Sequence, residues 1–151
     1  MRVSVIGGGR VDEATTAVAK ELGELLAERD HTVVCGGYGG VMEAVCRGAK
    51  RHDGRTVGIL KGTDHREGNR YLDTAVATGI GNARNPLVVM NGDGVIAVDG
   101  GTGTLSELGH ALDFDKPVAG LSTHDCSGFS GFEAVDTVEE AVASVERRAS
   151  G

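Results

Sequence analysis

Two glycine-rich segments each follow an apolar run, in places where a backbone can hold a phosphate group. They are Gly36-Gly37-Tyr38-Gly39-Gly40 and Gly100-Gly101-Thr102-Gly103-Thr104. Glycine lets the backbone approach a ligand closely, and the free N–H groups and dipole at a helix start favour an anion. The Thr102 and Thr104 hydroxyls add hydrogen-bond donors. The residues therefore predict a phosphate site built from two strand-to-helix turns.

Two widespread phosphate motifs do not fit this sequence. No glycine is followed by Lys-Ser or Lys-Thr, which a Walker A loop needs. A dinucleotide fingerprint would use Gly7 and Gly9, but its third glycine would fall on Asp12, and Cys35-Gly36 replaces the expected acid. Binding of NAD in the usual mode is therefore not expected. Gly8 and Gly9 remain candidate ligand contacts because an all-glycine turn adds little bulk.

The two segments resemble the paired motifs of the LOG (Lonely Guy) family. The first stretch that resembles the family is residues 36–42 followed by Ala44, and the second is residues 100–107, which read GGTGTLSE. The resemblance extends in order and spacing from Val3 to about Leu121. It implies a Rossmann-like fold. The family's enzymes are nucleoside 5′-monophosphate phosphoribohydrolases, formerly described as lysine decarboxylases, an activity that we do not expect here. A nearer match is a small prokaryotic branch that includes molybdenum-cofactor-carrier-like proteins, so the resemblance implies either a nucleoside monophosphate or a molybdopterin-like ligand.

The resemblance also implies which residues form the site. In the family's enzymes an arginine before the fifth strand acts together with the glutamate that ends the GGxGTxxE motif, and Arg84 and Glu107 occupy those positions. A carboxylate can stabilise or attack the C1′ cation that develops as a ribose–base bond breaks, and arginine can clamp a phosphate. The candidate ligand contacts are Gly8, Gly9, Gly36, Gly37, Gly39, Gly40, Met42, Asn85, Gly100, Gly101, Thr102, Gly103 and Thr104.

Four residues depart from the pattern of the family's enzymes. Asp99 replaces a proline, Asn85 replaces a basic residue, and Asn82-Ala83 replaces a His-Glu pair. An added anion and a lost cation both weaken a phosphate site, unless a divalent cation bridges Asp99 to the ligand. The sequence therefore favours a carrier or sensor that binds a nucleotide-like phosphate ligand without turning it over. Hydrolysis of a nucleoside monophosphate is the alternative, and enzymatic activity stays open.

Composition and charge disfavour several other classes of protein. The chain has 151 residues, and we expect residues 1–151 to form one domain. Its 22 acids and 15 bases give a net charge of −7, which disfavours nucleic acid as a partner. The beginning of the chain lacks a signal-peptide pattern and no apolar run approaches 18 residues, so we expect a cytoplasmic protein without a membrane partner. The three cysteines share no CxxC spacing and predict buried thiols, and no metal site is expected.

Strands that alternate with helices must position these residues. Apolar runs predict strands at residues 3–6, 32–35, 56–60, 74–78, 94–98 and 117–121, and a short one at 132–135. Helical spacing predicts helices at 11–28, 41–51, 82–90, 104–114 and 137–148, with residues 61–71 as an exposed loop. This order indicates a doubly wound, mostly parallel α/β sheet with helices on both faces, whose ligands bind beyond the carboxyl ends of the strands. Apolar faces on the helices at 82–90 and 104–114, together with the resemblance, predict a homodimer.

Overall fold

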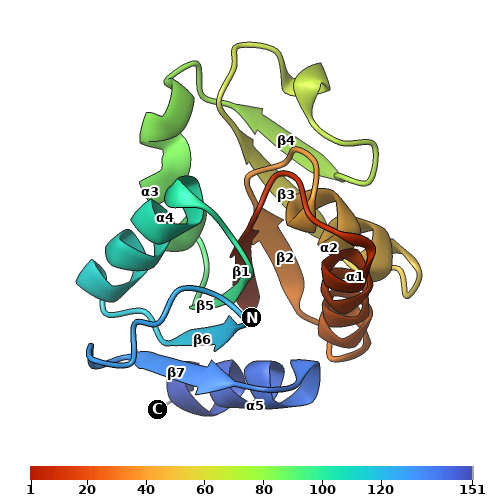
Figure 1. Ribbon diagram of the computed structural model, residues 1–151. Coiled ribbons are helices and arrows are strands. Elements are labelled where there is room, and N and C mark those ends of the chain that lie inside the picture. Colours follow the sequence, from red (N-terminus) through yellow and green to blue (C-terminus); the bar gives the residue numbers. More distant parts are fainter. Residues whose placement is uncertain (151) are drawn as a thin grey trace.

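The computed structural model describes residues 1–150 and contains a parallel β-sheet between two layers of helices (Figure 1). The strands pair in the order β4-β3-β2-β1-β5-β6-β7, and every pairing is parallel. They are β1 (Arg2–Gly7), β2 (Thr32–Cys35), β3 (Thr56–Leu60), β4 (Thr74–Ala77), β5 (Gly94–Val98), β6 (Val118–Leu121) and β7 (Phe132–Val135). The α-helices are α1 (Glu13–Glu28), α2 (Val41–Lys50), α3 (Asn85–Met90), α4 (Thr102–Asp113) and α5 (Val138–Ala149). The predicted Rossmann-like α/β fold is confirmed.

The sheet reverses its direction of growth between β1 and β5. The chain builds outward from β1 to β4 and then returns to place β5 on the free side of β1, with Ile6 opposite Ala97 and Gly7 opposite Val98. In doubly wound sheets the crevice at such a switch point, beyond the carboxyl ends of the strands, is where ligands bind. The glycine turns that follow β1, β2 and β5 all lie at this end of the sheet.

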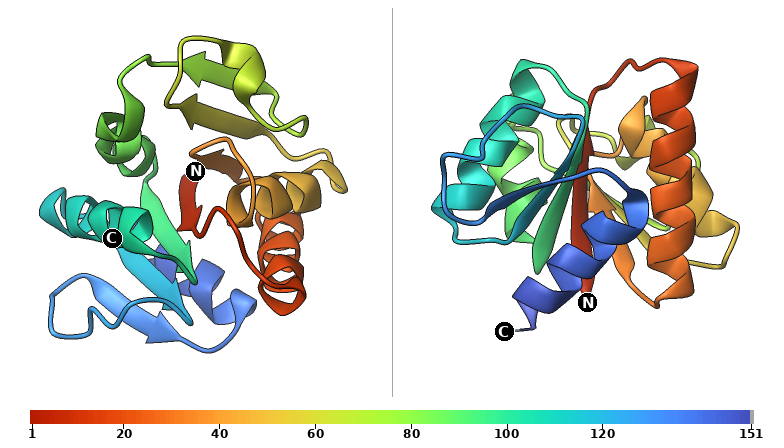
Figure 2. Two further views of the ribbon diagram at one scale, coloured as in Figure 1. Left: turned by 45° about the horizontal axis from the view of Figure 1, so that its top comes forward. Right: turned by 60° about the horizontal axis from the view of Figure 1, so that its bottom comes forward.

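Each face of the sheet is covered by its own set of helices (Figure 2). Helices α1, α2 and α5 pack on one face through residues such as Leu22, Val45 and Val142. Helices α3 and α4 pack on the other face through Val88 and Leu108. Because both faces are covered, all five residues of β5 are buried, which explains why its sequence is continuously apolar rather than alternating.

Two segments differ from the elements that the sequence predicts. The expected exposed loop at 61–71 contains a short 3₁₀ helix, η1 (His65–Glu67), whose start is capped by the Asp64 carboxylate. The helix expected from residue 82 begins as a 3₁₀ helix, η2 (Gly81–Arg84), and becomes α-helical only at Asn85. Pro86 has no N–H to donate to the Asn82 carbonyl, and the Asn85 N–H bonds to that oxygen instead.

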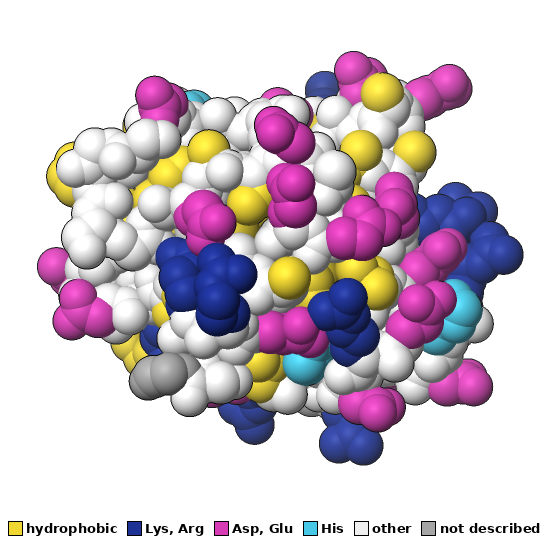
Figure 3. All heavy atoms as spheres, turned by 90° about the horizontal axis from the view of Figure 1, so that it is seen from below, with side chains coloured by type: hydrophobic (Ala, Val, Ile, Leu, Met, Phe, Trp, Pro, Cys, Tyr) yellow, Lys and Arg dark blue, Asp and Glu magenta, His cyan; other side chains and the backbone are white. Residues whose placement is uncertain are grey.

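The surface reflects the excess of acidic residues. On the side of the molecule that carries β7 and α5, acidic side chains are interspersed with hydrophobic ones and with Lys and Arg side chains (Figure 3). Within residues 1–150, no helix combines the length and the apolar character that crossing a membrane requires.

Candidate functional site

A cleft with a volume of about 250 Å³ lies at the carboxyl ends of β1, β2, β3 and β5. We call it the glycine cleft. It is lined by Gly7, Gly8, Gly9, Gly36, Met42, Lys61, Asn82, Arg84, Asn85, Gly101, Gly103, Thr104 and Glu107. Five stretches of the chain, at residues 7–9, 36–42, 61, 82–85 and 101–107, therefore meet in one place.

The glycine cleft collects most of the residues that the sequence singles out. The candidates that line it are Gly8, Gly9, Gly36, Met42, Arg84, Asn85, Gly101, Gly103, Thr104 and Glu107. The candidates that do not line it are Gly37, Gly39, Gly40, Gly100 and Thr102. A Cβ at Gly37 would lie 2.3 Å from the Leu60 side chain, so this glycine serves the packing of its own turn on β3.

The turn after β2 braces the neighbouring turn instead of standing open to a ligand. Gly40 has a positive φ of 64°, and a Cβ there would lie 2.1 Å from the Gly8 carbonyl oxygen. The Val41 N–H at the start of α2 donates to that same Gly8 oxygen at 3.0 Å. One of the free N–H groups expected for a ligand is thus used to hold the turn that follows β1.

The turn after β5 keeps its helix start open. No side chain caps Gly101 at the start of α4, and the first N–H groups of a helix lack partners within the helix. Cβ atoms built at Gly101 and Gly103 would meet nothing within 4 Å. Gly100 serves the turn itself, because its φ of 124° disfavours other residues. The start of α4 is therefore the part of the cleft best built to receive an anion.

Arg84 is buried with an exposed fraction of 6%, and backbone oxygens hold its guanidinium group. Its Nε donates to the Ile59 carbonyl at 2.8 Å, its Nη2 donates to the Gly36 carbonyl at 3.3 Å, and its Nη1 donates to Asn85 Oδ1. A Cβ at Gly36 would lie 2.5 Å from Nη2, so a larger residue there would have to displace the guanidinium group from this position. Three of the roughly five guanidinium N–H groups are used, which leaves about two for a ligand.

Asn85 connects Arg84 to the turn after β5. Its Nδ2 donates to Ser106 Oγ at 3.2 Å, and Ser106 Oγ donates to the Gly103 carbonyl at 2.7 Å. Asn85 stands where the resembling enzymes carry a basic residue. In this chain its side-chain amide holds the guanidinium group of the preceding residue, Arg84.

Glu107 is the one carboxylate in the lining of the glycine cleft, and its exposed fraction is 8%. Burial raises the pKa of the Glu107 carboxyl to about 7, and the positive charge of Arg84 opposes that rise. Burial also lowers the pKa of Arg84, against the effect of Glu107. Because its pKa lies near neutral pH, Glu107 can act as a proton donor or acceptor there.

We expect the Glu107 carboxyl to make folding stability fall as pH rises. Its pKa is about 7 in the folded protein and about 4.3 in an unfolded chain, so between these values the folded state binds the extra proton. The stabilisation from this group is complete below about pH 4.3 and is lost as pH rises through about 7, and the total loss is at most about 4 kcal/mol. Urea unfolding of wild type and Glu107→Gln at pH 5 and pH 8 measures the effect. The variant should gain stability relative to wild type at the higher pH, and parallel pH profiles would contradict the assignment.

Sequence reasoning missed Lys61, which lines the glycine cleft next to Tyr38. Lys61 Nζ lies 5.1 Å from the centre of the Tyr38 ring, and Arg84 Cζ lies 5.8 Å from it. The Tyr38 hydroxyl accepts the Lys61 N–H at 2.8 Å, which anchors the backbone that carries the lysine. Lys61 directly follows the last residue of β3, and that position at the carboxyl end of a strand is the signal that could have found it. Asn82 also lines the cleft and was not among the candidates.

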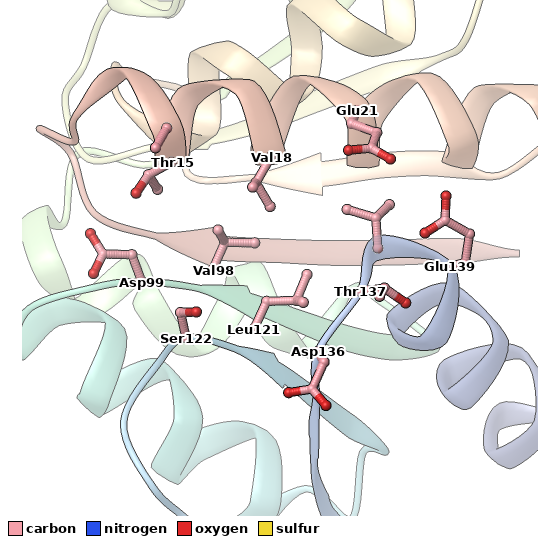
Figure 4. A pocket seen from close by; sticks show the side chains of 12 residues that line it. Thr15, Val18, Glu21, Val98, Asp99, Leu121, Ser122, Asp136, Thr137 and Glu139 are labelled. Atoms are coloured by element: carbon pink, nitrogen blue, oxygen red, sulfur yellow. The ribbon is translucent and has the colours of Figure 1, made fainter.

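Asp99 lies outside the lining of the glycine cleft. It follows β5 with a positive φ of 55°, and its carboxylate lines a separate groove between α1 and α5 (Figure 4). The ionisable side chains in the cleft lining are therefore two cations, Lys61 and Arg84, and one carboxyl, Glu107.

Comparison with known proteins shows similarity along nearly the whole chain. The model of the SLOG cluster4 family matches residues 1–148. An uncharacterized protein of Archaeoglobus fulgidus is 42% identical over 142 residues, which cover 94% of this chain and 92% of that protein.

The similar solved structures include proteins that are described as binding or carrying the molybdenum cofactor. The molybdenum cofactor binding protein of Rippkaea orientalis has a TM-score of 0.90 and 32% identity over 97% of this chain and 96% of its own. The molybdenum cofactor carrier protein of Chlamydomonas reinhardtii has a TM-score of 0.89 and 29% identity over 99% of both chains. DNA processing protein A of Helicobacter pylori has a TM-score of 0.73 and 16% identity over 98% of this chain and 81% of its own, a likeness of fold alone.

Proposed function

This chain belongs to the SLOG cluster4 family, and on that premise we propose that it binds and carries a nucleotide-like phosphate ligand in the glycine cleft. The resemblance to LOG-like and molybdenum-cofactor-carrier-like proteins is confirmed by the family match and by the similar structures. Within this class we propose the molybdenum cofactor, a pterin that bears a phosphate, as the cargo.

The composition of the cleft wall carries this proposal. Lys61 and Arg84 line it against the single carboxylate of Glu107, whose raised pKa of about 7 reduces its negative charge at neutral pH. The open start of α4 adds backbone N–H groups. Because Gly101 and Gly103 have no side chains and face open space, a ligand can approach the backbone closely there. A site with this balance attracts an anion even in a chain whose net charge is −7.

A ligand panel tests the proposal. Thermal or urea unfolding would be measured with AMP, GMP, a pterin phosphate and the molybdenum cofactor. A ligand at about 100 times its Kd should stabilise the protein by about 2.7 kcal/mol if only the native state binds it. The largest shift is expected with the molybdenum cofactor. The absence of a shift with every member at millimolar concentration would refute a phosphate-ligand function.

One observation favours a second candidate function, hydrolysis of a nucleoside monophosphate. Glu107, with a pKa of about 7, and the buried Arg84 line the same cleft, and both occupy the positions at which the resembling enzymes act. A buried carboxyl that is half protonated at neutral pH suits acid–base work on a ribose–base bond. The two functions share a ligand site and differ in turnover.

We also propose that the protein forms a homodimer through the face that carries α4 and the segment after β6. Leu105 and Phe129 are 48% and 66% exposed, and both line a cavity of about 400 Å³ together with Leu112 and Cys126. Exposed apolar patches of this kind mark contact surfaces. Light scattering at micromolar concentration should give a dimer for wild type and a monomer for Phe129→Asp. A monomeric wild type would contradict the proposal.

A further inference from the structure

A groove with a volume of about 420 Å³ lies between α1 and α5, over the carboxyl ends of β5 and β6 (Figure 4). We call it the acidic groove. It is larger than the glycine cleft, and no residue lines both cavities. It is lined by Ala14, Thr15, Val18, Glu21, Val98, Asp99, Leu121, Ser122, Asp136, Thr137, Val138 and Glu139.

The lining combines an aliphatic middle with negative charge at both ends. Val18, Val98 and Leu121 occupy the middle of the groove, with Asp99 at one end and Glu21 and Glu139 at the other (Figure 4). Asp136 adds a fourth carboxylate on the rim. The lining contains no lysine, arginine, histidine or aromatic side chain.

The four carboxylates are not neutralised by the protein itself. Within residues 1–150, none of Glu21, Asp99, Asp136 and Glu139 takes part in any of the ion pairs. They also do not converge, since the described part of the chain has no group of three or more acidic, histidine or cysteine side chains placed to hold a metal ion. Separated negative charges suit a ligand whose positive charges are separated as well.

We propose that the acidic groove binds a linear aliphatic diamine or triamine. Its methylene chain packs on Val18, Val98 and Leu121, and its ammonium groups face Asp99 at one end and Glu21 with Glu139 at the other. An aliphatic ligand is favoured over an aromatic cation because the groove offers aliphatic contacts and no ring to stack on. The site lies beyond the proposed function, since it neither shares residues with the glycine cleft nor suits a phosphate.

Calorimetric titration with putrescine and spermidine tests the inference. We expect saturable binding of one ligand per chain that weakens as salt is raised. Each methylene that becomes fully buried should strengthen binding by up to about fourfold. n-Butylamine has a similar methylene chain but only one ammonium group. Because it can meet the carboxylates at only one end of the groove, it should bind more weakly than putrescine.

Variants that each remove one carboxylate charge test whether spermidine binds in the acidic groove. Glu21→Gln and Glu139→Gln should each weaken spermidine binding by about two- to fivefold, the range for exposed charge pairs. Glu28→Gln is the matched control, because Glu28 is an exposed carboxylate on the same helix as Glu21 but outside the groove. Gly101→Val should leave amine binding unchanged, which separates this site from the glycine cleft.

Three results would overturn the inference. The first is the absence of spermidine binding at millimolar concentration and low salt. The second is an equal loss of binding in Glu28→Gln, because a general attraction to the acidic surface would then explain the signal. The third is displacement of spermidine by an equal concentration of Mg²⁺, which would show counterion screening instead of a site shaped for an organic amine.

Discussion

Replacing Gly101 with valine is expected to abolish stabilisation by the phosphate ligand while the protein remains folded. Gly101 has a φ of −106°, which other residues adopt, and a Cβ there would meet nothing within 4 Å. The valine side chain would therefore enter the open side of the turn, where the backbone must approach the ligand. The stabilisation of about 2.7 kcal/mol at 100 times the wild-type Kd should disappear. Loss of a favourable helix-start residue should cost about 1 kcal/mol of stability.

Gly128→Val provides the matched control for this prediction. Gly128 is exposed, a Cβ there would also meet nothing within 4 Å, and it does not line the glycine cleft. Thermal unfolding of both variants, with and without ligand, should show an unchanged shift for Gly128→Val and none for Gly101→Val. A full shift in Gly101→Val would place the ligand elsewhere.

Substituting Glu107 with glutamine is expected to separate a carrier from a hydrolase. Glutamine keeps the shape of the side chain and its ability to form hydrogen bonds but removes the charge that would stabilise a cation at C1′. In a hydrolase, release of base from AMP or GMP should fall by at least about 100-fold, since a positioned acid or base contributes about 10²–10⁴-fold, or about 2.7–5.5 kcal/mol. In the carrier that we propose, neither wild type nor variant releases base, and only ligand affinity changes. Chromatography of the nucleotide after prolonged incubation measures the difference.

Arg84→Ala completes this experiment. Arg84 is buried and bonded to the backbone of β3 and of the turn after β2, so its folded state must first be verified by thermal unfolding. Base release that survives both Glu107→Gln and Arg84→Ala would defeat both candidate functions, because it would place the chemistry away from these two residues.

Local patterns in the sequence determined the elements and the end of the sheet at which the site lies. Apolar β-branched runs and helical spacing depend on neighbours a few residues apart, so strands such as residues 32–35 and 56–60 were predicted with the bounds that the structure has. Glycine turns after parallel strands must gather at one edge of the sheet, which brought Gly36, Gly101 and Glu107 together as expected.

Only the tertiary structure decided what each turn does and which charges face the cleft. Gly40 and Val41 support the turn after β1 because α2 packs close to it, whereas the start of α4 meets no such neighbour and stays open. Lys61 lines the cleft and its backbone N–H is held by Tyr38 from another turn, whereas Asp99 lines the neighbouring groove, with its carboxylate close to Gly8. These outcomes depend on contacts between residues that are distant in the chain. Spacing along the sequence places a residue at the end of a strand, but packing decides which cavity its side chain lines.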